Sequence, residues 1–415
     1  MGTSESSLKE FLRGWHVGAE LLDGVERHYP FRSTRYYAGL IGAPGDPIWR
    51  QVVPDAVELE DRTGWEDPLN EENLSPVPNL VHRYRNRVLW LVSSECAVHC
   101  RFCTRKRRWQ NPQPLTEEGF QEGLKYIATH REIRDVLLSG GDPLLLPFPR
   151  LDAILSSLRQ IAHVEVIRIG SRLPCVLPHG ITTTLTGMLA RYHPIYLNLH
   201  FNHPRELTPE ANRACHLLSD AGIPLGSQTV LLRGVNDQAE VLGELFQSLL
   251  RARVRPYYLM QMDLIQSAAH FRTPIGKGIE IIESLLGHTS GFAVPTYVVD
   301  APGGGGKIPL TPNYILSYSD QKVVLRNYEG FITTYYEPTE YQPIDPSLTA
   351  PFKGEILEPG QSGVAGLLAG DAMSLKPAGF DQVHQRGGEP HRLRDRTEKW
   401  VPRGIGDGKS ADNEA

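Results

Sequence analysis

Cys96, Cys100 and Cys103 form a C-x3-C-x2-C pattern in a chain of 415 residues that holds only five cysteines. Three thiolates on one short loop can each bind one iron of a [4Fe-4S] cluster and leave the fourth iron open to a small chelating molecule. A structural zinc site would need a fourth protein ligand, which His99 could supply. Zinc modules usually pair a C-x2-C with a second such pair elsewhere in the sequence, and this chain has no second pair. The spacing therefore favours the cluster over zinc.

A basic run follows the cysteines directly, from Arg105 to Arg108, and Trp109 comes next. Such a run could form a nucleic-acid patch. The formal net charge of the whole chain is −5, which argues against a dedicated nucleic-acid binder. We therefore expect the run to bind small anions. A zinc-stabilised nucleic-acid-binding protein is the alternative from a different functional class.

Four consecutive glycines at positions 303–306 precede Lys307. Glycine lets the backbone approach a ligand closely and adopt φ values that other residues avoid. A Walker A phosphate loop does not fit, because it needs glycine where Ala301 stands and serine or threonine where Ile308 stands. A lysine held at a strand end is suited to forming a Schiff base with an aldehyde cofactor such as pyridoxal phosphate. A solvated turn with an incidental lysine is the alternative.

The elements that must position these motifs alternate between strands and helices from about residue 88 to 300. Apolar runs predict strands at 88–92, 136–138, 164–169, 195–199, 227–232, 257–262 and 294–299. A period of 3.6 residues predicts helices at 116–130, with Thr116 as N-cap, and at 208–221, 238–251 and 275–286. Repeated βα units imply parallel strands with right-handed crossovers. The sequence therefore predicts an α/β protein with a partial (β/α)6-type barrel.

The barrel is expected to span residues 86–305, after a mainly helical N-terminal region at 1–85. A β-rich C-terminal extension should cover 306–345. Residues 346–415 are rich in proline, glycine and mixed charges with few apolar residues, so we expect a flexible tail there.

Polar residues that could do chemistry fall mostly just after the predicted strands. They are Cys96, the Gly140-Gly141-Asp142 segment, Ser171-Arg172, the segment from His200 to His203, Asp263 and Asp300. Loops are polar in any protein, which explains part of this distribution. In parallel α/β folds, however, the carboxyl ends of the strands are where sites are built. We expect these residues to share one rim of the barrel.

Two segments carry a resemblance to a known family. Residues 96–107 resemble the cluster loop of radical S-adenosylmethionine enzymes, and residues 257–307, with their Asp-Ala-Pro-(Gly)4-Lys end, resemble lysine 2,3-aminomutases. The resemblance extends over roughly residues 35–340. It implies an isomerase that moves the α-amino group of L-lysine to the β-carbon by a radical mechanism, giving β-lysine. The same chemistry on arginine, or on a lysyl group attached to a protein, is the alternative within this class.

The resemblance also implies three cofactors and assigns residues to them. Cys96, Cys100 and Cys103 would bind the [4Fe-4S] cluster. S-adenosylmethionine would lie near Gly140, Gly141, Asp142, His200 and Gln228. Pyridoxal 5'-phosphate would be bound by Lys307, which is also the expected catalytic residue, and by Arg83, Tyr84 and Arg87, for which a basic surface before a strand is the alternative. Arg105 would bind the substrate carboxylate, and Asp263 and Asp300 would bind the distal ammonium of lysine.

Partners and location are expected from the same resemblance and from composition. The resemblance implies a flavodoxin or ferredoxin as electron donor and a homo-oligomer without a nucleic-acid partner. No apolar stretch approaches the roughly 18 residues of a membrane span, and the N-terminus lacks a secretory h-region. Three crowded cysteines suit a reducing compartment. We therefore expect a cytoplasmic enzyme with no membrane partner.

Overall fold

The computed structural model describes residues 23–319 and 321–338. The expected tail at 346–415 lies outside the described residues. None of the helices within the described ranges is long and apolar enough to cross a membrane.

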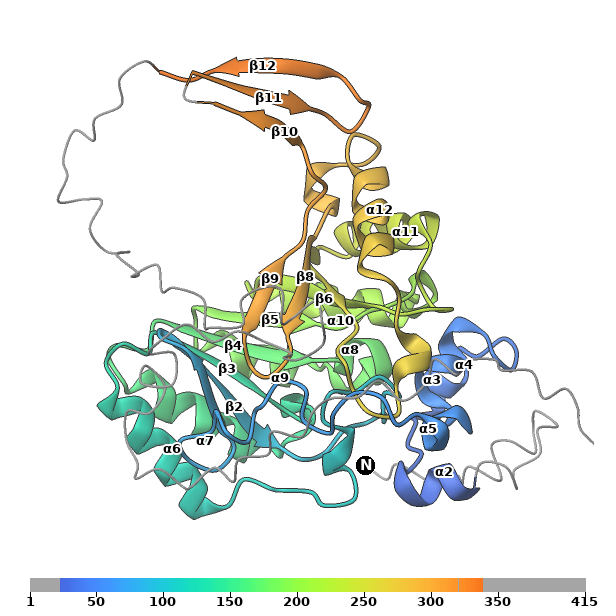
Figure 1. The fold of residues 1–415 in the computed structure, drawn as a ribbon. Coiled ribbons are helices and arrows are strands. Elements are labelled where there is room, and N and C mark those ends of the chain that lie inside the picture. Colours follow the sequence, from blue (N-terminus) through green and yellow to red (C-terminus); the bar gives the residue numbers. More distant parts are fainter. Residues whose placement is uncertain (1–22, 320, 339–415) are drawn as a thin grey trace, which may run out of the picture. The chain divides into compact units, whose positions relative to one another are not determined.

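A nine-stranded sheet forms the centre of the fold, and its strands are neighbours in the order in which they occur along the chain (Figure 1). The strands are β1 (Leu80–Tyr84), β2 (Arg87–Ser93), β3 (Asp135–Gly140), β4 (Val166–Ser171), β5 (Ile195–Leu199), β6 (Leu225–Leu231), β7 (Arg255–Gln261), β8 (Thr296–Ala301) and β9 (Gly306–Pro309). Strands β2 to β8 pair in parallel, which gives six parallel pairings. The sheet is the partial, parallel-rich barrel that the sequence predicts.

Each of the strands β2 to β7 is followed by a helix that returns the chain to the next strand. These helices are α6 (Glu117–Thr129), α7 (Phe148–Arg159), α9 (Thr183–Ala190), α10 (Pro209–Asp220), α11 (Ala239–Arg251) and α12 (Ile275–Leu285). A short helix, α8 (Leu173–Val176), precedes α9. The expected N-cap is confirmed, because the Thr116 hydroxyl accepts a hydrogen bond from the Gly119 amide at 3.1 Å.

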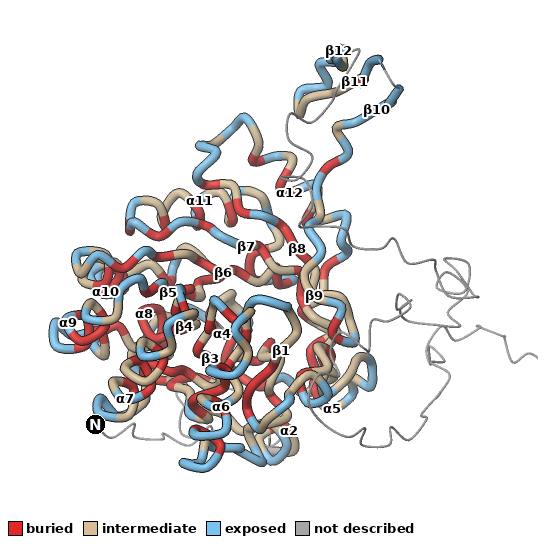
Figure 2. The backbone as a smooth tube through the Cα atoms, turned by 90° about the vertical axis from the view of Figure 1, so that its left-hand side faces the viewer, coloured by how far each residue is buried: buried red, intermediate tan, exposed pale blue. Residues whose placement is uncertain are grey.

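Packing follows the two periodicities of the sequence. Helix α11 buries Leu242, Leu245, Phe246 and Leu249, which share one face at helical spacing. Strand β4 alternates half-buried and buried residues along its length. Figure 2 shows buried residues along the strands and on parts of the helices, whereas exposed residues gather at the turns between elements. This core fixes the strand ends, and so fixes the loops that follow them.

Two antiparallel strands lie at the sheet edges: β1, which was not predicted, and β9, which lies within the predicted β-rich extension but joins the main sheet. Strand β1 pairs with β2, and β9 pairs with β8. Strand β1 lies within the region at 1–85 that we expected to be mainly helical. Both strands are short and only partly apolar, and β9 begins inside the glycine run, so neither has an alternating apolar pattern for sequence analysis to detect.

The remaining elements lie before β1 and after β9. The N-terminal helices are α2 (Asp23–His28), α3 (Arg35–Ala38), α4 (Pro47–Val52) and α5 (Val57–Glu60). After β9 a three-stranded antiparallel sheet contains β10 (Ile315–Tyr318), β11 (Lys322–Arg326) and β12 (Ile332–Tyr336). The described part of the C-terminal extension is thus rich in strands, as expected.

Candidate active site

The three cysteines of the C-x3-C-x2-C pattern lie in the loop that follows β2, and all three are half-buried free thiols. Burial and the neighbouring thiols raise the pKa of Cys96 well above its usual range, and the same causes raise that of Cys103 to about 11. Such buried thiols are poor nucleophiles by themselves, because the thiolate is the reactive form. A cation at this position would stabilise the thiolates, which suits metal ligands better than a reactive cysteine.

The zinc alternative finds no support in the loop geometry. Zinc requires four ligands converging on one point at about 2.0–2.3 Å. In the described ranges, no group of three or more His, Cys, Asp or Glu side chains could hold a metal ion. His99 is engaged elsewhere, because its Nδ1 lies 2.8 Å from the Pro30 carbonyl oxygen and its ring stacks on Trp109. Thiolates that each bind a different iron of a cubic cluster do not need to converge in this way.

The basic run after the cysteines is paired with acids inside the protein. Lys106 is buried, and its Nζ lies 2.7 Å from the Glu58 carboxylate. Arg105 pairs with Glu71 at 2.6 Å, and Arg107 pairs with Asp67 at 3.1 Å. Three of the four basic residues are therefore engaged by acids, and Arg108 Nη1 donates to the Asn79 side-chain oxygen at 3.4 Å, which argues against a cationic surface of the kind that nucleic acids bind. Of the residues in this run, Arg105 is the one that we still expect to bind a small anion.

Glu58 anchors the cysteine loop from helix α5. Its carboxylate accepts hydrogen bonds from Nε and Nη2 of Arg101 at 2.9 and 2.6 Å, in addition to the Lys106 ammonium. All three side chains are almost fully buried. Arg101 also donates its backbone amide to the Gln51 carbonyl at 2.8 Å. Glu58 could not be predicted from the sequence, because nothing local distinguishes it from a surface acid.

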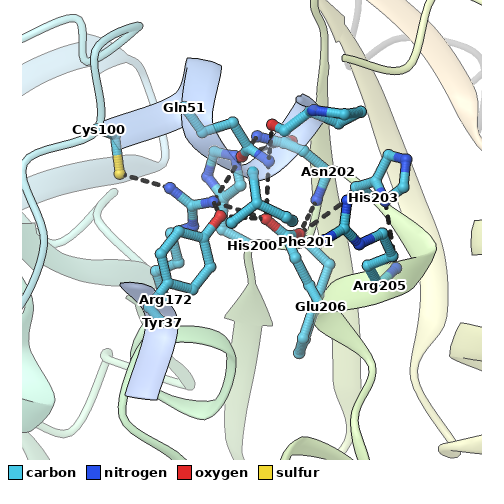
Figure 3. Close-up of polar contacts among 12 residues, drawn as sticks. Tyr37, Gln51, Cys100, Arg172, His200, Phe201, Asn202, His203, Arg205 and Glu206 are labelled. Atoms are coloured by element: carbon cyan, nitrogen blue, oxygen red, sulfur yellow. Dashed lines mark hydrogen bonds and ion pairs between the residues drawn. The ribbon is translucent and has the colours of Figure 1, made fainter. Parts of the chain in front are cut away.

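A second network approaches the cysteines from the end of β4 (Figure 3). Arg172 donates from Nη1 to the Cys100 sulfur at 2.7 Å. Its Nη2 is held by Glu206 at 2.9 Å, by Gln51 at 2.6 Å and by Tyr37 at 2.9 Å. The backbone amide of Arg105 points to the Cys103 sulfur at 3.4 Å. Hydrogen bonds to the sulfurs are a usual feature of iron–sulfur sites, so the loop and its surroundings fit a [4Fe-4S] cluster.

Gly140 and Gly141 cross directly over the segment that leads into Cys96. Gly140 has φ +128°, and a Cβ there would lie 2.1 Å from the Ser93 carbonyl oxygen. A Cβ on Gly141 would lie 2.2 Å from the Glu95 carbonyl oxygen, so only glycine permits this approach. The motif that the resemblance assigns to S-adenosylmethionine therefore also positions the cysteine loop.

Asp142, His200 and Gln228 are the other residues that the resemblance assigns to the same ligand. The Asp142 carboxylate accepts hydrogen bonds from the Ser171 hydroxyl at 2.8 Å and the Arg172 amide at 2.8 Å, and so links the ends of β3 and β4. His200 lies close to the cysteine loop, with its ring centroid 5.5 Å from that of Phe102. Burial and the charge of Arg172 lower the pKa of His200 to about 3, so the ring is neutral. Gln228 lies half-buried in β6.

The structure brings Lys307 together with two of the residues expected to bind its cofactor. The Lys307 backbone amide donates to the Tyr84 hydroxyl at 2.8 Å, and Arg83 donates to the Gly305 carbonyl at 2.5 Å. The Arg87 guanidinium lies 3.9 Å from the centre of the Tyr84 ring. These contacts join β1 to the glycine run, which lies more than 200 residues later in the sequence.

The glycine run gives the Lys307 backbone its close approach to β1. Gly303, Gly304 and Gly306 all have positive φ, and a Cβ on Gly306 would lie 3.0 Å from the Tyr84 hydroxyl. Lys307 thus lies beside two arginines and a tyrosine, next to a glycine backbone without side chains. A lysine can bond to an aldehyde and arginines can bind a phosphate, so this arrangement fits an aldehyde cofactor that carries a phosphate.

Opposite charges meet around Asp263, which follows β7. Lys307 Nζ lies 2.6 Å from Asp300 Oδ2. Burial and the charge of Asp300 raise the pKa of Asp263 to about 7, and Lys307 and Arg105 partly offset this rise. Glu71 also contributes to the rise, so five side chains are close enough to influence one another electrostatically. Arg105, Asp263 and Asp300 are thus near enough for their charges to interact, and their roles in binding a substrate stay predictions.

Comparison with known proteins matches both motifs. Residues 90–245 match the Radical SAM superfamily, and residues 282–400 match the family described as Lysine-2,3-aminomutase. The L-lysine 2,3-aminomutase of Clostridium subterminale is 52% identical over 353 residues, which cover 84% of this chain and 84% of that protein. The L-lysine 2,3-aminomutase of Methanococcus maripaludis is 54% identical over 319 residues, or 75% of this chain and 73% of that one. The glutamate 2,3-aminomutase of Clostridioides difficile is 43% identical over 314 residues, with coverage of 75% and 74%.

Proposed function

The chain belongs to the lysine 2,3-aminomutase family, and we propose that it is an isomerase that moves the α-amino group of L-lysine to the β-carbon, giving β-lysine. The observation that carries the choice of substrate is the charge arrangement around Asp263. Arg105 is a cation and Asp300 is a second acid whose charges both act on this carboxyl group. Free lysine has the matching charges at its two ends.

The residues divide the binding of lysine between them. Arg105 would bind the carboxylate with its planar guanidinium, and Asp263 and Asp300 would bind the ε-ammonium. Two opposite unit charges ~4 Å apart attract by about 4 kcal/mol at an effective dielectric constant of ~20, before the cost of desolvation. A second carboxylate at the far end, as in glutamate, would be repelled by the same acids. Arginine, and a lysyl group on a protein, share the cationic end and remain the alternative substrates.

The cofactors supply the difficult chemistry when bound: the cluster and S-adenosylmethionine provide a radical that abstracts a hydrogen atom, and pyridoxal phosphate holds the migrating nitrogen. Cys96, Cys100 and Cys103 would hold the cluster. Lys307 would hold pyridoxal phosphate.

The chain's own residues position these groups and the substrate. Asp300 now carries the Lys307 ammonium at 2.6 Å. Asp300 would exchange this ammonium for that of the substrate when lysine binds. Arg83, Tyr84 and Arg87 would hold the rest of pyridoxal phosphate beside the glycine run. Gly140, Gly141 and Asp142, together with His200 and Gln228, would border S-adenosylmethionine.

We also propose that a flavodoxin or ferredoxin reduces the cluster, that the enzyme is cytoplasmic and that it forms a homo-oligomer. A cluster that must be reduced by one electron requires such a low-potential donor, and donors of this kind occur in reducing compartments.

The test is an anaerobic assay of the reconstituted and reduced protein with S-adenosylmethionine and pyridoxal phosphate. L-Lysine, L-arginine and L-glutamate are supplied separately, and the products are separated by chromatography. We expect β-lysine as the main product, and its loss in Lys307→Ala. Lys322→Ala, which removes an exposed lysine from β11, is the matched control and should keep the activity. Faster conversion of glutamate or arginine than of lysine would contradict the assignment of the substrate.

A further inference from the structure

Glu71 is a buried acid that the proposed mechanism does not use. It lies between α5 and β1, and only 3% of its surface is exposed. One of its carboxylate oxygens accepts hydrogen bonds from Arg105 Nη2 at 2.6 Å and Nε at 3.1 Å, and the other accepts from Nε at 3.0 Å. Burial alone would raise the pKa of Glu71, but Arg105, with Arg107 and Arg108, lowers it. The acid is therefore ionised and fixed to one side of Arg105.

The hydrogen-bond donors of Arg105 are divided between its two sides. A guanidinium has one N–H on Nε and two on each Nη, five in all. Glu71 accepts hydrogen bonds from the single N–H of Nε and from one N–H of Nη2. The Ser139 hydroxyl accepts one from Nη1 at 3.4 Å. One N–H remains on Nη1 and one on Nη2. Two N–H groups at the end of the guanidinium are what a bidentate carboxylate needs.

Glu71 is also paired with a second arginine, Arg107. Arg107 Nη2 lies 3.5 Å from Glu71 Oε2 and 3.1 Å from Asp67 Oδ1, and Arg107 Nε lies 3.2 Å from Glu72 Oε1. The pair of Glu71 and Arg105 is therefore part of a braced network. A flexible arginine loses conformational freedom when it binds a ligand, and a braced one has already lost most of it.

We propose that Glu71 is a positioning residue for the substrate: it grips the Nε–Nη2 side of Arg105 and leaves the Nη1–Nη2 end to the α-carboxylate of lysine. This inference rests on the proposed function, in which Arg105 binds that carboxylate. It predicts that Glu71 acts on the carboxylate end of the substrate by hydrogen bonds to Arg105, and on the ammonium end only weakly, through the effect of its charge on Asp263.

The experiment compares two ligands that differ only at that end. L-Lysine and cadaverine, which is lysine without its carboxylate, are titrated anaerobically into the holoenzyme by calorimetry. In Glu71→Gln, which keeps the shape and removes the charge, we expect the Kd of L-lysine to rise by about ten- to a hundredfold, as for the loss of a charged hydrogen bond. The Kd of cadaverine should change by less than about twofold, within the scatter of a surface substitution. Glu71→Asp, which keeps the charge, should restore part of the affinity for L-lysine.

Two controls separate positioning from a loss of folding. Glu60→Gln changes an exposed acid in α5, and should leave both affinities unchanged. In an Arg105→Gln background, Glu71→Gln should add no further loss, because both changes act through one contact. Cadaverine binding reports the folded site in every variant.

The outcomes distinguish the inference from the function on which it rests. Two results in Glu71→Gln would overturn the inference and leave the function intact. One is an equal weakening of L-lysine and cadaverine binding. The other is tighter binding of L-lysine, which would mean that Glu71 competes with the substrate carboxylate. Failure of the unchanged enzyme to bind L-lysine more tightly than cadaverine would instead overturn the role of Arg105, and the inference with it.

Discussion

Replacing Glu58 by glutamine tests how the cysteine loop is held. The substitution keeps the shape of the side chain and removes the one acid that pairs with both Arg101 and Lys106. Arg101 and Glu58 are fully buried, and Lys106 has only 2% of its side chain exposed. Removing one partner of a buried ion pair costs about 3–5 kcal/mol, because the other charge stays buried without compensation.

The two cations respond differently to the loss of Glu58. Arginine stays charged in proteins, so Arg101 bears the cost. Burial lowers the pKa of Lys106 to about 8 even though Glu58 opposes the shift, so without Glu58 this pKa must fall further. The folded variant then releases the proton of Lys106 at a pH where the unfolded chain keeps it. Its stability therefore rises with pH in that window, and its deficit should be larger at pH 6 than at pH 8.

The assay is urea unfolding of the purified protein, followed by iron analysis after reconstitution. With an m value of about 3 kcal/mol/M or more for a chain of this size, the midpoint should fall by on the order of 1 M. Iron content should fall too, since Arg101 lies between Cys100 and Cys103. Glu60→Gln, an exposed acid in the same helix, is the control. A midpoint that is unchanged in Glu58→Gln would refute the claim that this acid anchors the loop.

Two further predictions concern the substrate acids and the glycines. Because the pKa of Asp263 is raised to about 7, binding of L-lysine should weaken as the pH falls below that value. Asp300→Asn removes the repelling charge, so it should move the midpoint of this pH dependence to lower pH. A midpoint that stays or rises would contradict this. Gly141→Ala places a Cβ 2.2 Å from the Glu95 carbonyl oxygen. It should therefore lower the free energy of unfolding, measured by thermal unfolding, by about 1–3 kcal/mol, and it should lower the iron content. The control is Gly187→Ala, whose Cβ would meet no atom within 4 Å and which should do neither.

The regular part of the fold was predictable from the sequence because its physical signals are local. The seven parallel strands are largely apolar runs of five to seven residues, and the loops that follow them carry the expected motifs. Thr116 marks its helix because an N-cap acts on the amide three residues on. Cys96 and Lys307 could be identified because the cysteine spacing and the four glycines that mark them are close in the sequence.

The residues that support the site could not be predicted in the same way. Glu58 and Glu71 are acids in the N-terminal region, and what distinguishes them is burial against arginines that follow about 34–43 residues later. The basic run did imply that acids were needed, without indicating which ones. Arg172 was noticed as a polar residue at a strand end, but its contact with Cys100 depends on the barrel bringing β2 and β4 to one rim.

The proposed function makes one claim above all, that the α-amino nitrogen of lysine moves to the β-carbon without being released as ammonia. Incubating the reduced holoenzyme with L-lysine labelled with 15N at the α-amino group, and following the product by NMR, tests it directly. We predict β-lysine with the 15N bonded to the β-carbon and no label in free ammonia. Label that stays on the α-carbon, or appears as ammonia, would contradict the account.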